Sequence, residues 1–344
     1  MRRMKWSGML LVAVLLAVVV IAGCGEGGNA EETDAEAQDA AQAQTEDSGA
    51  AQSNAAEPAE EKAQSRTIVH AMGETTVTGT PERVVSLYQG ANDVAVAFGI
   101  TPVGIVESWS PEEPVYAYLQ DALGDVPLLG AEHQPNLEEV HKLKPDVILA
   151  TKLRHEKIYD QLSAIAPTVM IDQVYDWKDT VRLMGEALGQ QDKADELMQA
   201  WDTRVADFKT QMEGQLPIEA TITNFRADHA RIFYSGYAGG ILKELGFTRP
   251  PGHDSEEWGV QLTSKESIQD MNADVIFNFN SPDETGAVDQ LYEEWTAHPL
   301  WQNLDAVKNG HVVQVDGTAW NFAGGYLSAH IMLDELYAHF GLDQ

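Results

Sequence analysis

Short apolar runs alternate with amphipathic stretches along the chain from Arg66 onward. Each apolar run is bounded by Gly, Pro or Asp and has the length of a buried strand, so the pattern predicts strands separated by helices. Such an alternation indicates an α/β fold with a mainly parallel sheet. The strand-like runs are residues 84–87, 102–106, 147–150 and 168–171, and the helical stretches between them are residues 91–98 and 137–143.

A long amphipathic stretch follows this first region. Apolar side chains recur at three- and four-residue steps from Ala194 to Met212, which predicts one helix of about five turns. We interpret its continuous apolar stripe as core packing rather than as a ligand surface. After Pro217 the alternation resumes, with strand-like residues 220–225 and 231–234 and a helical stretch at 239–245.

Two segments from different halves of the chain are similar to each other. Residues 137–148 can be laid over residues 265–276 without a gap, at a constant offset of 128 positions. Glu138 then falls on Glu266, and Asp-Val-Ile at the end of one segment falls on Asp-Val-Ile of the other. The similarity predicts that each half contains the same helix-then-strand unit, with a glutamate in its first turn. Coincidence is the alternative, because aspartate is common before a buried strand.

The folded part therefore divides into two α/β lobes joined by a helical segment. We place the first lobe at residues 66–175, the interlobe helical segment at 176–215 and the second lobe at 216–344. Cys24 is the only cysteine of the 344 residues, so the body after it contains no disulfide, thiolate metal site or catalytic thiol. Its stability must come from buried apolar surface, which a chain of this length can supply.

The first 23 residues have the layout of a secretory signal. Three basic residues lie within the first five, residues 9–21 form an apolar run, and small residues precede Cys24. A cysteine at this place resembles the cleavage point of a bacterial lipoprotein signal, where the thiol is acylated and becomes the mature N-terminus. The alternative is an uncleaved membrane anchor, since the run is shorter than the roughly 20 residues of a spanning helix. Both interpretations export the chain.

Residues 24–65 have the composition of an acidic tether. Between 25 and 64 the chain contains no aromatic or branched aliphatic residue, so it cannot offset the entropy of ordering and we expect it to be disordered. A transient Ala/Glu helix is the alternative, which would change the reach of the tether but not its role.

The net charge limits the partners. The chain carries a formal charge of −32, of which residues 1–23 contribute +3 and residues 25–64 contribute −10, leaving −25 for the body. Nucleic acid is excluded as a partner because phosphate binding needs a basic surface. An anionic small ligand is still allowed, since charges more than about 8 Å apart are screened from each other.

Five motifs in the body carry a resemblance to a known family. Together, in this order and behind a lipoprotein signal, they are similar to the substrate-binding lipoproteins of ABC importers for ferric siderophores, a class that includes cobalamin and haem binders. Residues 224–229 and 320–326 further resemble a branch that takes hydroxamate or citrate-type siderophores. The five motifs are Pro81-Glu82-Arg83-Val84-Val85, Gly99-Ile100-Thr101-Pro102-Val103-Gly104, Pro135-Asn136-Leu137-Glu138, Leu143-Lys144-Pro145-Asp146-Val147-Ile148 and Leu304-Asp305-Ala306-Val307-Lys308-Asn309-Gly310.

The resemblance implies two rigid Rossmann-like lobes, a long helix that limits hinge motion, and a ligand cleft between the lobes. It also implies a monomeric receptor outside the cell that delivers its ligand to an ABC permease dimer with a cytoplasmic ATPase. A ferric siderophore arrives with its iron coordinated by chelator oxygens. The protein would then need no metal ligands and no intrinsic cofactor, only cationic, hydrogen-bonding and aromatic groups.

Such groups belong at the carboxyl ends of strands. Basic, polar and aromatic side chains follow several of the predicted strands, and we select eight as candidates for ligand binding. They are Tyr88, Gln89, Trp109, Lys152, Arg154, Arg226, His229 and Trp320.

Each candidate also has a structural interpretation. Arg226 can pair with Asp228 instead of a ligand, although we favour ligand binding. Lys152 and Arg154 can be ordinary solvated charges, and His229 can cap a turn. The three aromatic candidates can equally be interlobe packing.

Glu138 and Glu266 have a second predicted role. In the family that the chain resembles, one glutamate on the outer face of each lobe pairs with arginines of the two permease subunits. The alternative is helix capping, because Thr263 and Glu266 have capping-box spacing and Asn136 with Glu139 offers the same nearby. We favour docking, chiefly because Glu138 falls outside the Asn136 box.

Other function classes fit less well. The sequence contains no Gly-x-Ser-x-Gly elbow, no glycine-rich phosphate loop and no His-Glu-x-x-His helix, so we expect no enzyme. The ten histidines are scattered, which argues against a receptor for bare metal ions. Cobalamin or haem binding is the strongest alternative because fold and tether would be the same, but the basic loops favour a ligand with anionic oxygens.

Overall fold

A computed structural model describes residues 65–344 except 111, 256 and 282. The predicted signal, the predicted acylation site Cys24 and nearly all of the predicted tether lie outside the described residues. The described residues belong to one compact unit, Glu60–Gln344. None of the helices in this described part is long and apolar enough to cross a membrane.

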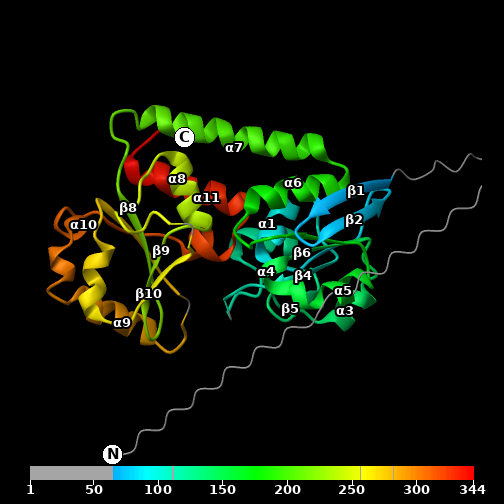
Figure 1. Cartoon of the computed structure of the whole chain (residues 1–344), viewed down its shortest axis with the longest axis horizontal. Coiled ribbons are helices and arrows are strands. Elements are labelled where there is room, and N and C mark those ends of the chain that lie inside the picture. Colours follow the sequence, from blue (N-terminus) through cyan, green and yellow to red (C-terminus); the bar gives the residue numbers. More distant parts are fainter. Residues whose placement is uncertain (1–64, 111, 256, 282) are drawn as a thin grey trace, which may run out of the picture. The chain divides into compact units, whose positions relative to one another are not determined.

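The first lobe is built on a five-stranded parallel sheet. Its strands are β3 (Val84–Ser86), β4 (Gly104–Glu107), β5 (Leu128–Ala131), β6 (Val147–Thr151) and β7 (Thr168–Ile171), and its order is β5-β4-β3-β6-β7. Helices cover both faces, which explains why the strands are continuous apolar runs (Figure 1). The helical elements are α1 (Gln89–Ala97), η1 (Ala117–Leu119), α2 (Gln120–Leu123), α3 (Leu137–Lys142), α4 (Lys152–His155), η2 (Glu156–Ile158), α5 (Tyr159–Ser163) and α6 (Trp177–Leu188).

The second lobe repeats this strand order with one reversed strand. Its strands are β8 (Ala220–Phe225), β9 (Ala230–Phe233), β10 (Gly259–Leu262), β11 (Val275–Asn280) and β12 (Val312–Gln314), in the order β10-β9-β8-β11-β12. Strand β9 is antiparallel to both neighbours, whereas β11 is parallel to β8 and β12. The helical elements are α8 (Tyr237–Leu245), η3 (Lys265–Met271), α9 (Ala287–Thr296), η4 (Trp301–Asn303), α10 (Asp305–Lys308), the π-helix η5 (Thr318–Phe322) and α11 (Tyr326–Phe340).

The predicted helix-then-strand repeat is confirmed. Residue Asn136 caps α3, and the residue 128 positions later, Ser264, caps η3. Asp146 accepts hydrogen bonds from two backbone N–H groups just before β3, and its counterpart Asp274 accepts one from Glu219 just before β8. In the first lobe the aspartate thus connects the start of β6 to the start of the neighbouring strand β3. In the second lobe it connects the start of β11 to the start of β8. One difference is that η3 is a 3₁₀-helix and α3 is an α-helix.

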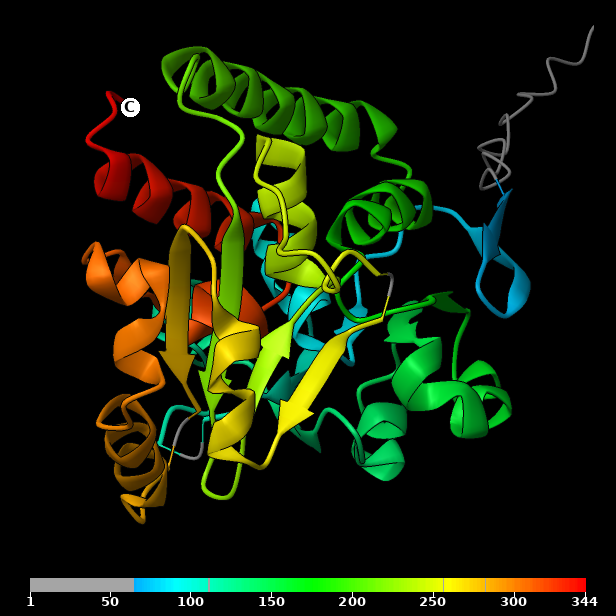
Figure 2. The ribbon, with the colours of Figure 1, turned by 60° about the vertical axis from the view of Figure 1, so that its left-hand side comes forward.

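The predicted interlobe segment contains two helices. Helix α7 (Gln191–Gln211) is the predicted long helix, and it packs on α6 of the first lobe and α8 of the second (Figure 2). A turn at Gly189, with positive φ, separates α7 from α6. The apolar periodicity did not reveal this break between the two helices. Trp201 of α7 is fully buried, and its indole N–H donates to Glu244 of α8 at 3.1 Å. The same carboxylate pairs with Lys178 of α6 at 2.6 Å, so one acid joins three helices.

The described body begins with a hairpin that the sequence did not predict. Strands β1 (Ser65–His70) and β2 (Gly73–Thr78) pair antiparallel. The Arg66 guanidinium donates to the carbonyls of Glu186 and Ala187 at 2.8 and 2.7 Å. A cation at the last carbonyls of α6 is favourable with the helix dipole. The hairpin is therefore anchored to the first lobe at the position where the composition changes.

The carboxylate of Asp93 joins the first lobe to the last helix of the second lobe. Asp93 lies on α1, is fully buried, and accepts hydrogen bonds from the backbone N–H groups of Leu327 and Ser328 at 2.7 and 2.9 Å. These are donors of the first turn of α11, whose N-cap Gly325 has no side chain to accept them. Tyr118 donates to the same carboxylate at 2.7 Å. A residue of the first lobe therefore caps the last helix of the second lobe.

Gly325 is required for this contact. A Cβ at that position would overlap the carboxyl group of Asp93. Tyr237 of α8 holds the other side of the same peptide, since its hydroxyl donates to the Gly325 carbonyl at 2.6 Å. Burial raises the pKa of Asp93, and the hydrogen bonds from Tyr118, Leu327 and Ser328 oppose that shift.

We predict that Asp93→Ala destabilises the protein strongly. The substitution leaves two N–H groups of α11 buried without an acceptor, which should lower the free energy of unfolding by about 2–4 kcal/mol. Urea denaturation measures the change. Asp121→Ala is the matched control, because Asp121 is exposed on α2, and its effect should stay within about 0.5 kcal/mol. Equal effects of the two substitutions would contradict the capping role.

Candidate functional site

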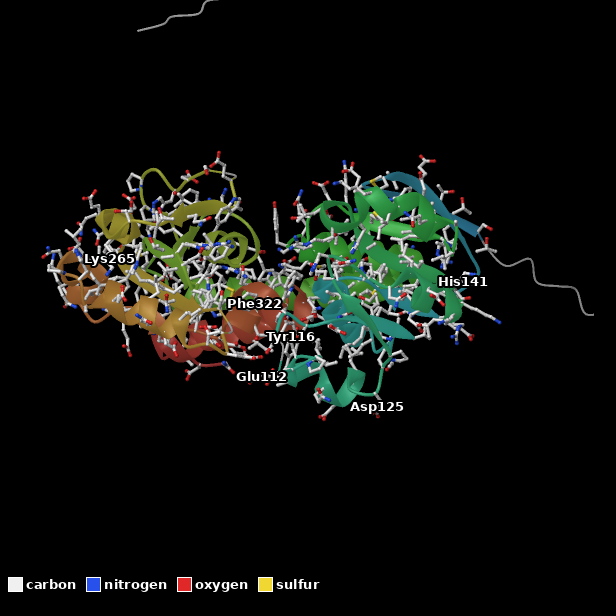
Figure 3. All side chains as sticks on the ribbon, turned by 90° about the horizontal axis from the view of Figure 1, so that it is seen from below. Glu112, Tyr116, Asp125, His141, Lys265 and Phe322 are labelled. Carbon is white, nitrogen blue, oxygen red and sulfur yellow. The ribbon has the colours of Figure 1, made fainter. Side chains whose placement is uncertain are left out.

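A cavity of about 360 Å³ lies between the two lobes at the carboxyl ends of several strands. Its first wall comes from the loops after β3, β4, β5 and β6, and its second from β8, β9, β11 and α8. The segment 320–324 lines it as well. Figure 3 shows Tyr116 of the first lobe beside Phe322 of the second, and the Tyr116 hydroxyl donates to the Phe322 carbonyl at 3.3 Å.

The first wall presents one arginine that is already paired. Arg154 Nε donates to Glu132 Oε1 at 3.2 Å, and the Arg154 guanidinium lies 5.5 Å from the centre of the Trp109 ring. Glu132 is only 4% exposed and also accepts a hydrogen bond from the Gln89 backbone N–H at 3.1 Å. Burial raises the pKa of Glu132, while the bonds from Gln89 and Arg154 act in the opposite direction. The guanidinium edge away from Nε remains available to a ligand.

The second wall presents two arginines, Arg226 and Arg231, and neither has an acid at ion-pair distance within the described residues. The Nε of Arg226 is buried, and its guanidinium has no hydrogen-bond or ion-pair partner among the described residues. Burial lowers the pKa of Arg226, the charge of Arg231 lowers it further, and the charge of Asp228 acts in the opposite direction. The Arg231 guanidinium lies 5.3 Å from the centre of the Trp258 ring. Each lobe thus contributes one arginine stacked on a tryptophan.

Sequence analysis missed Arg231 and Trp258. Arg231 begins the predicted strand 231–234, whereas the candidates were chosen only among residues that follow a strand. Because β9 runs antiparallel to β8, its first residues return to the edge where β8 ends, next to Arg226. The short polar segment 226–229 between two apolar runs is a hairpin signal that could have indicated this reversal. Trp258 precedes β10 in a loop that carries no such signal.

Five of the eight predicted ligand-binding residues line the cavity. Gln89, Trp109, Arg154 and Arg226 are placed as described, although the Gln89 amide N–H₂ is used by the Glu107 carbonyl at 2.6 Å. Trp320 also borders the cavity but is only 1% exposed, and its indole N–H donates to Glu335 at 2.8 Å. Trp320 is therefore mostly packed behind the cavity surface and offers little of its ring to a ligand.

The other three predicted residues lie elsewhere. Tyr88 is buried in the core, where its hydroxyl donates to Thr180 at 3.0 Å. Lys152 begins α4 and is not among the residues that line the cavity, whereas Arg154, two residues on, reaches Glu132. His229 is 7% exposed and lies behind Arg231, which it contacts through a hydrogen bond. Strand-end position alone does not tell which side chains face the cleft.

The charges of the cavity favour an anion. Three arginines and one glutamate line it, and the glutamate is engaged by Arg154. The chain as a whole carries −32, so this local positive charge runs against the composition. Within the described residues, no group of three or more His, Cys, Asp or Glu side chains is arranged to hold a metal ion. The lining can donate hydrogen bonds to anionic oxygens and stack against planar groups.

Glu138 and Glu266 are both exposed at the second position of their helices. The caps are the side chains of Asn136 and Ser264, so the alternative interpretation, a capping box between Thr263 and Glu266, does not describe the start of η3. The Glu138 carboxylate lies 3.2 Å from Lys142 Nζ, an exposed contact of little energy. Figure 3 places His141 of α3 and Lys265 of η3 at opposite outer ends of the two lobes.

We predict opposite effects of removing two of the cavity arginines from the ligand-free protein. Arg226→Met removes a desolvated charge without a partner and should raise the free energy of unfolding by about 1 kcal/mol. Arg154→Met leaves the buried Glu132 without its cation and should lower it by about 2 kcal/mol. Urea denaturation of both variants checks the contrast. A loss of stability in Arg226→Met would contradict the prediction, because it would show that the charge of Arg226 stabilises the ligand-free protein.

Comparisons with known proteins agree with this geometry. The family model described as periplasmic binding protein matches residues 84–319. The achromobactin-binding periplasmic protein of Dickeya dadantii (strain 3937) is 44% identical over 262 residues, which cover 74% of this chain and 85% of that protein. A probable siderophore-binding lipoprotein of Bacillus subtilis (strain 168), YfiY, is 38% identical over 285 residues, which cover 80% of this chain and 87% of that protein.

A solved structure matches this chain over nearly the whole length of the solved protein. The crystal structure of Staphylococcus aureus SirA complexed with staphyloferrin B has a TM-score of 0.78 and 47% sequence identity, and the match covers 81% of this chain and 99% of that one. The fold expected from the sequence, with parallel sheets in two α/β lobes, is thus found both in the structure and in its relatives. This chain belongs to the periplasmic binding protein family, whose relatives here are siderophore-binding proteins of ABC importers.

Proposed function

We propose that this protein is an extracytoplasmic receptor that binds a ferric siderophore, of citrate or hydroxamate type, and delivers it to an ABC permease for iron uptake. The observation that carries the proposal is the pair Arg226 and Arg231. Two partly desolvated cations that have no ion-pair partner among residues 65–344 as described are unfavourable in the free protein, and a ligand with anionic oxygens lowers that penalty.

The cavity lining suits a metal that arrives already chelated. Arginine donates in a planar fork that matches carboxylate and similar oxygen pairs. Arg226 and Arg231 would meet the ligand from the second lobe and Arg154 from the first. Trp109 and Trp258, which are 39% and 46% exposed, offer flat faces to the organic frame of the ligand. Iron would stay coordinated by the chelator, and the protein would supply no ligand to it and need no cofactor.

Names of relatives support the same ligand class. A Bacillus subtilis relative that is 30% identical over 325 residues is described as an Fe(3+)-citrate-binding protein, and SirA was crystallised with staphyloferrin B. We further propose that the receptor is held at the outer face of the membrane by a lipid on Cys24 and acts as a monomer. Contacts on both lobes would favour a closed liganded state, and the ATPase of the importer would supply the energy for release.

We predict that Arg226→Ala weakens binding by at least about tenfold, because it removes charge-assisted hydrogen bonds to the ligand. Quenching of tryptophan fluorescence during titration with ferric citrate and a ferric trihydroxamate measures the affinity. Lys152→Ala is the control, since Lys152 lies outside the cavity lining, and it should stay within about twofold of the wild type.

The same titration tests the ligand class. The panel adds a ferric tris-catecholate, cyanocobalamin and haem to the two complexes above. The expected result is tight binding of a citrate or hydroxamate complex. Tight binding of cobalamin or haem alone would replace the proposed ligand, while the fold and the receptor role would stand.

We propose that Glu138 and Glu266 dock the receptor on the permease. Both carboxylates are exposed, neither caps its helix, and the repeat places them at equivalent positions of the two lobes. A permease with two subunits would meet one acidic residue from each lobe. Exposed carboxylates are solvated in the free receptor, and they can pair with arginines of a partner when the complex forms.

The double variant Glu138→Ala, Glu266→Ala should bind its ligand like the wild type and fail to support iron uptake by cells. The expected loss is at least about tenfold in uptake rate, because two interfacial charge pairs disappear together. Radioactive-iron uptake and fluorescence titration give the two readouts. Glu139→Ala, beside Glu138 on α3, is the control, and normal uptake by the double variant would remove the docking role.

A further inference from the structure

A chain of three side chains lies directly behind the second wall of the cavity. Asp228 and His229 form the turn of the β8–β9 hairpin, and Arg231 follows on β9. The His229 Nδ1 lies 2.6 Å from Asp228 Oδ1, and Arg231 Nε donates to His229 Nε2 at 2.9 Å. Arg231 therefore has two supports, the His229 nitrogen at its Nε and the Trp258 ring beneath its plane.

The partners of the ring fix its protonation. The Nε of arginine is only a donor, so the His229 Nε2 that accepts from it must carry no proton. The proton of the neutral ring then sits on Nδ1 and is donated to the Asp228 carboxylate. Only the neutral imidazole in this tautomer satisfies both contacts, because a second proton would bring two N–H groups against each other.

We propose that His229 is a positioning residue for the ligand site: its neutral ring holds Arg231 in the cavity wall, and its protonation releases Arg231 and weakens binding. This inference rests on the proposed function, since it assumes that Arg231 meets the ligand. A second proton on the ring would occupy Nε2, so the ring could no longer accept the hydrogen bond from Arg231 Nε. The ring itself does not line the cavity, so it acts through Arg231.

The charges around His229 decide what protonation does. The described charged groups that face it are Asp228 on its own turn, Arg231 on β9 and Arg226 at the end of β8, whose backbone N–H donates to the His229 carbonyl at 2.9 Å. Neighbouring strands add polar but uncharged groups, Gln261 of β10 opposite Arg231 and Ser281 after β11. A charged His229 would make a third cation with one acid, and that acid is 81% exposed. The added repulsion falls on Arg231, the nearest cation.

The binding test compares affinities at about pH 7.5 and pH 5.5, on either side of the histidine range. The probe is ferric citrate, followed by tryptophan fluorescence. The wild type should bind at least about tenfold more weakly at the lower pH, as expected for losing a hydrogen-bonded charged donor. His229→Gln supplies an amide oxygen near the place of Nε2 that does not protonate. It should bind within about threefold of the wild type at the higher pH and lose most of the pH dependence.

Two further variants separate positioning from other effects. Arg231→Met should bind weakly at both pH values, with no additional loss at the lower one, because the group that His229 positions is gone. Any effect of pH on the ferric citrate complex itself is common to all variants and cancels in the comparison. The same pH dependence in the wild type and in His229→Gln would overturn the inference, and so would tighter binding of the wild type at the lower pH.

A ligand-free measurement tests the inference even if ferric citrate is not the ligand. Nitrogen-15 NMR of histidine-labelled protein should show His229, assigned by its absence from His229→Gln, with its proton on Nδ1 at the higher pH. Arg231→Met should leave that proton on Nδ1, because the Asp228 carboxylate can only accept, but it should change the Nε2 shift, because Nε2 loses the hydrogen bond from Arg231. A His229 with its proton on Nε2 would overturn the positioning role, whereas failure of every ferric complex to bind would overturn the proposed function alone.

Discussion

The capping of α11 by Asp93 is the interaction on which the arrangement of this protein depends. A buried carboxylate on the first helix of the first lobe satisfies the N-terminal N–H groups of the last helix of the chain. The contact needs a helix N-terminus without a side chain of its own, and Gly325 provides it. A buried charge with three donors is tolerated, while the same charge with none would not be. The contact between the two lobes is therefore constrained on both sides, by the buried carboxylate of Asp93 and by the glycine packed against it.

The cavity follows from this junction. The segment 320–324 lies directly before the capped helix and lines the floor, and α1 begins with Gln89 and Gly90 at the first wall. At Gly90 a Cβ would crowd the carbonyl of Gly324, so the backbones approach as closely as glycine allows. The floor is thus set by backbone contacts. The remaining freedom lies in the walls, where the charged and aromatic side chains stand.

The two walls use arginine differently. Arg154 is paired with Glu132, whereas Arg226 has no ion-pair partner in the part of the chain that the structure describes, and Arg231 donates to His229. A fully paired wall would have nothing left for a ligand, and a fully unpaired one would destabilise the free protein. The structure places the unpaired charge on the hairpin side, where β9 reverses. Helices α6, α7 and α8 are joined through Glu244 on the far side of the same lobes, which suits a receptor that moves little on binding.

The sequence alone determined the α/β class, the long helix, the repeated unit and the point where the body starts. These features depend on local periodicity and on short motifs, and the matched residues Asp146 and Asp274 have matching roles in both lobes. Strand-end position also identified Arg154 and Arg226. Tertiary structure decided the rest: the reversal of β9 brought Arg231 to the site, the start of α4 kept Lys152 out, and core packing buried Tyr88. Which face of a strand end or turn meets the other lobe depends on contacts between residues far apart in the chain, and local pattern does not encode them.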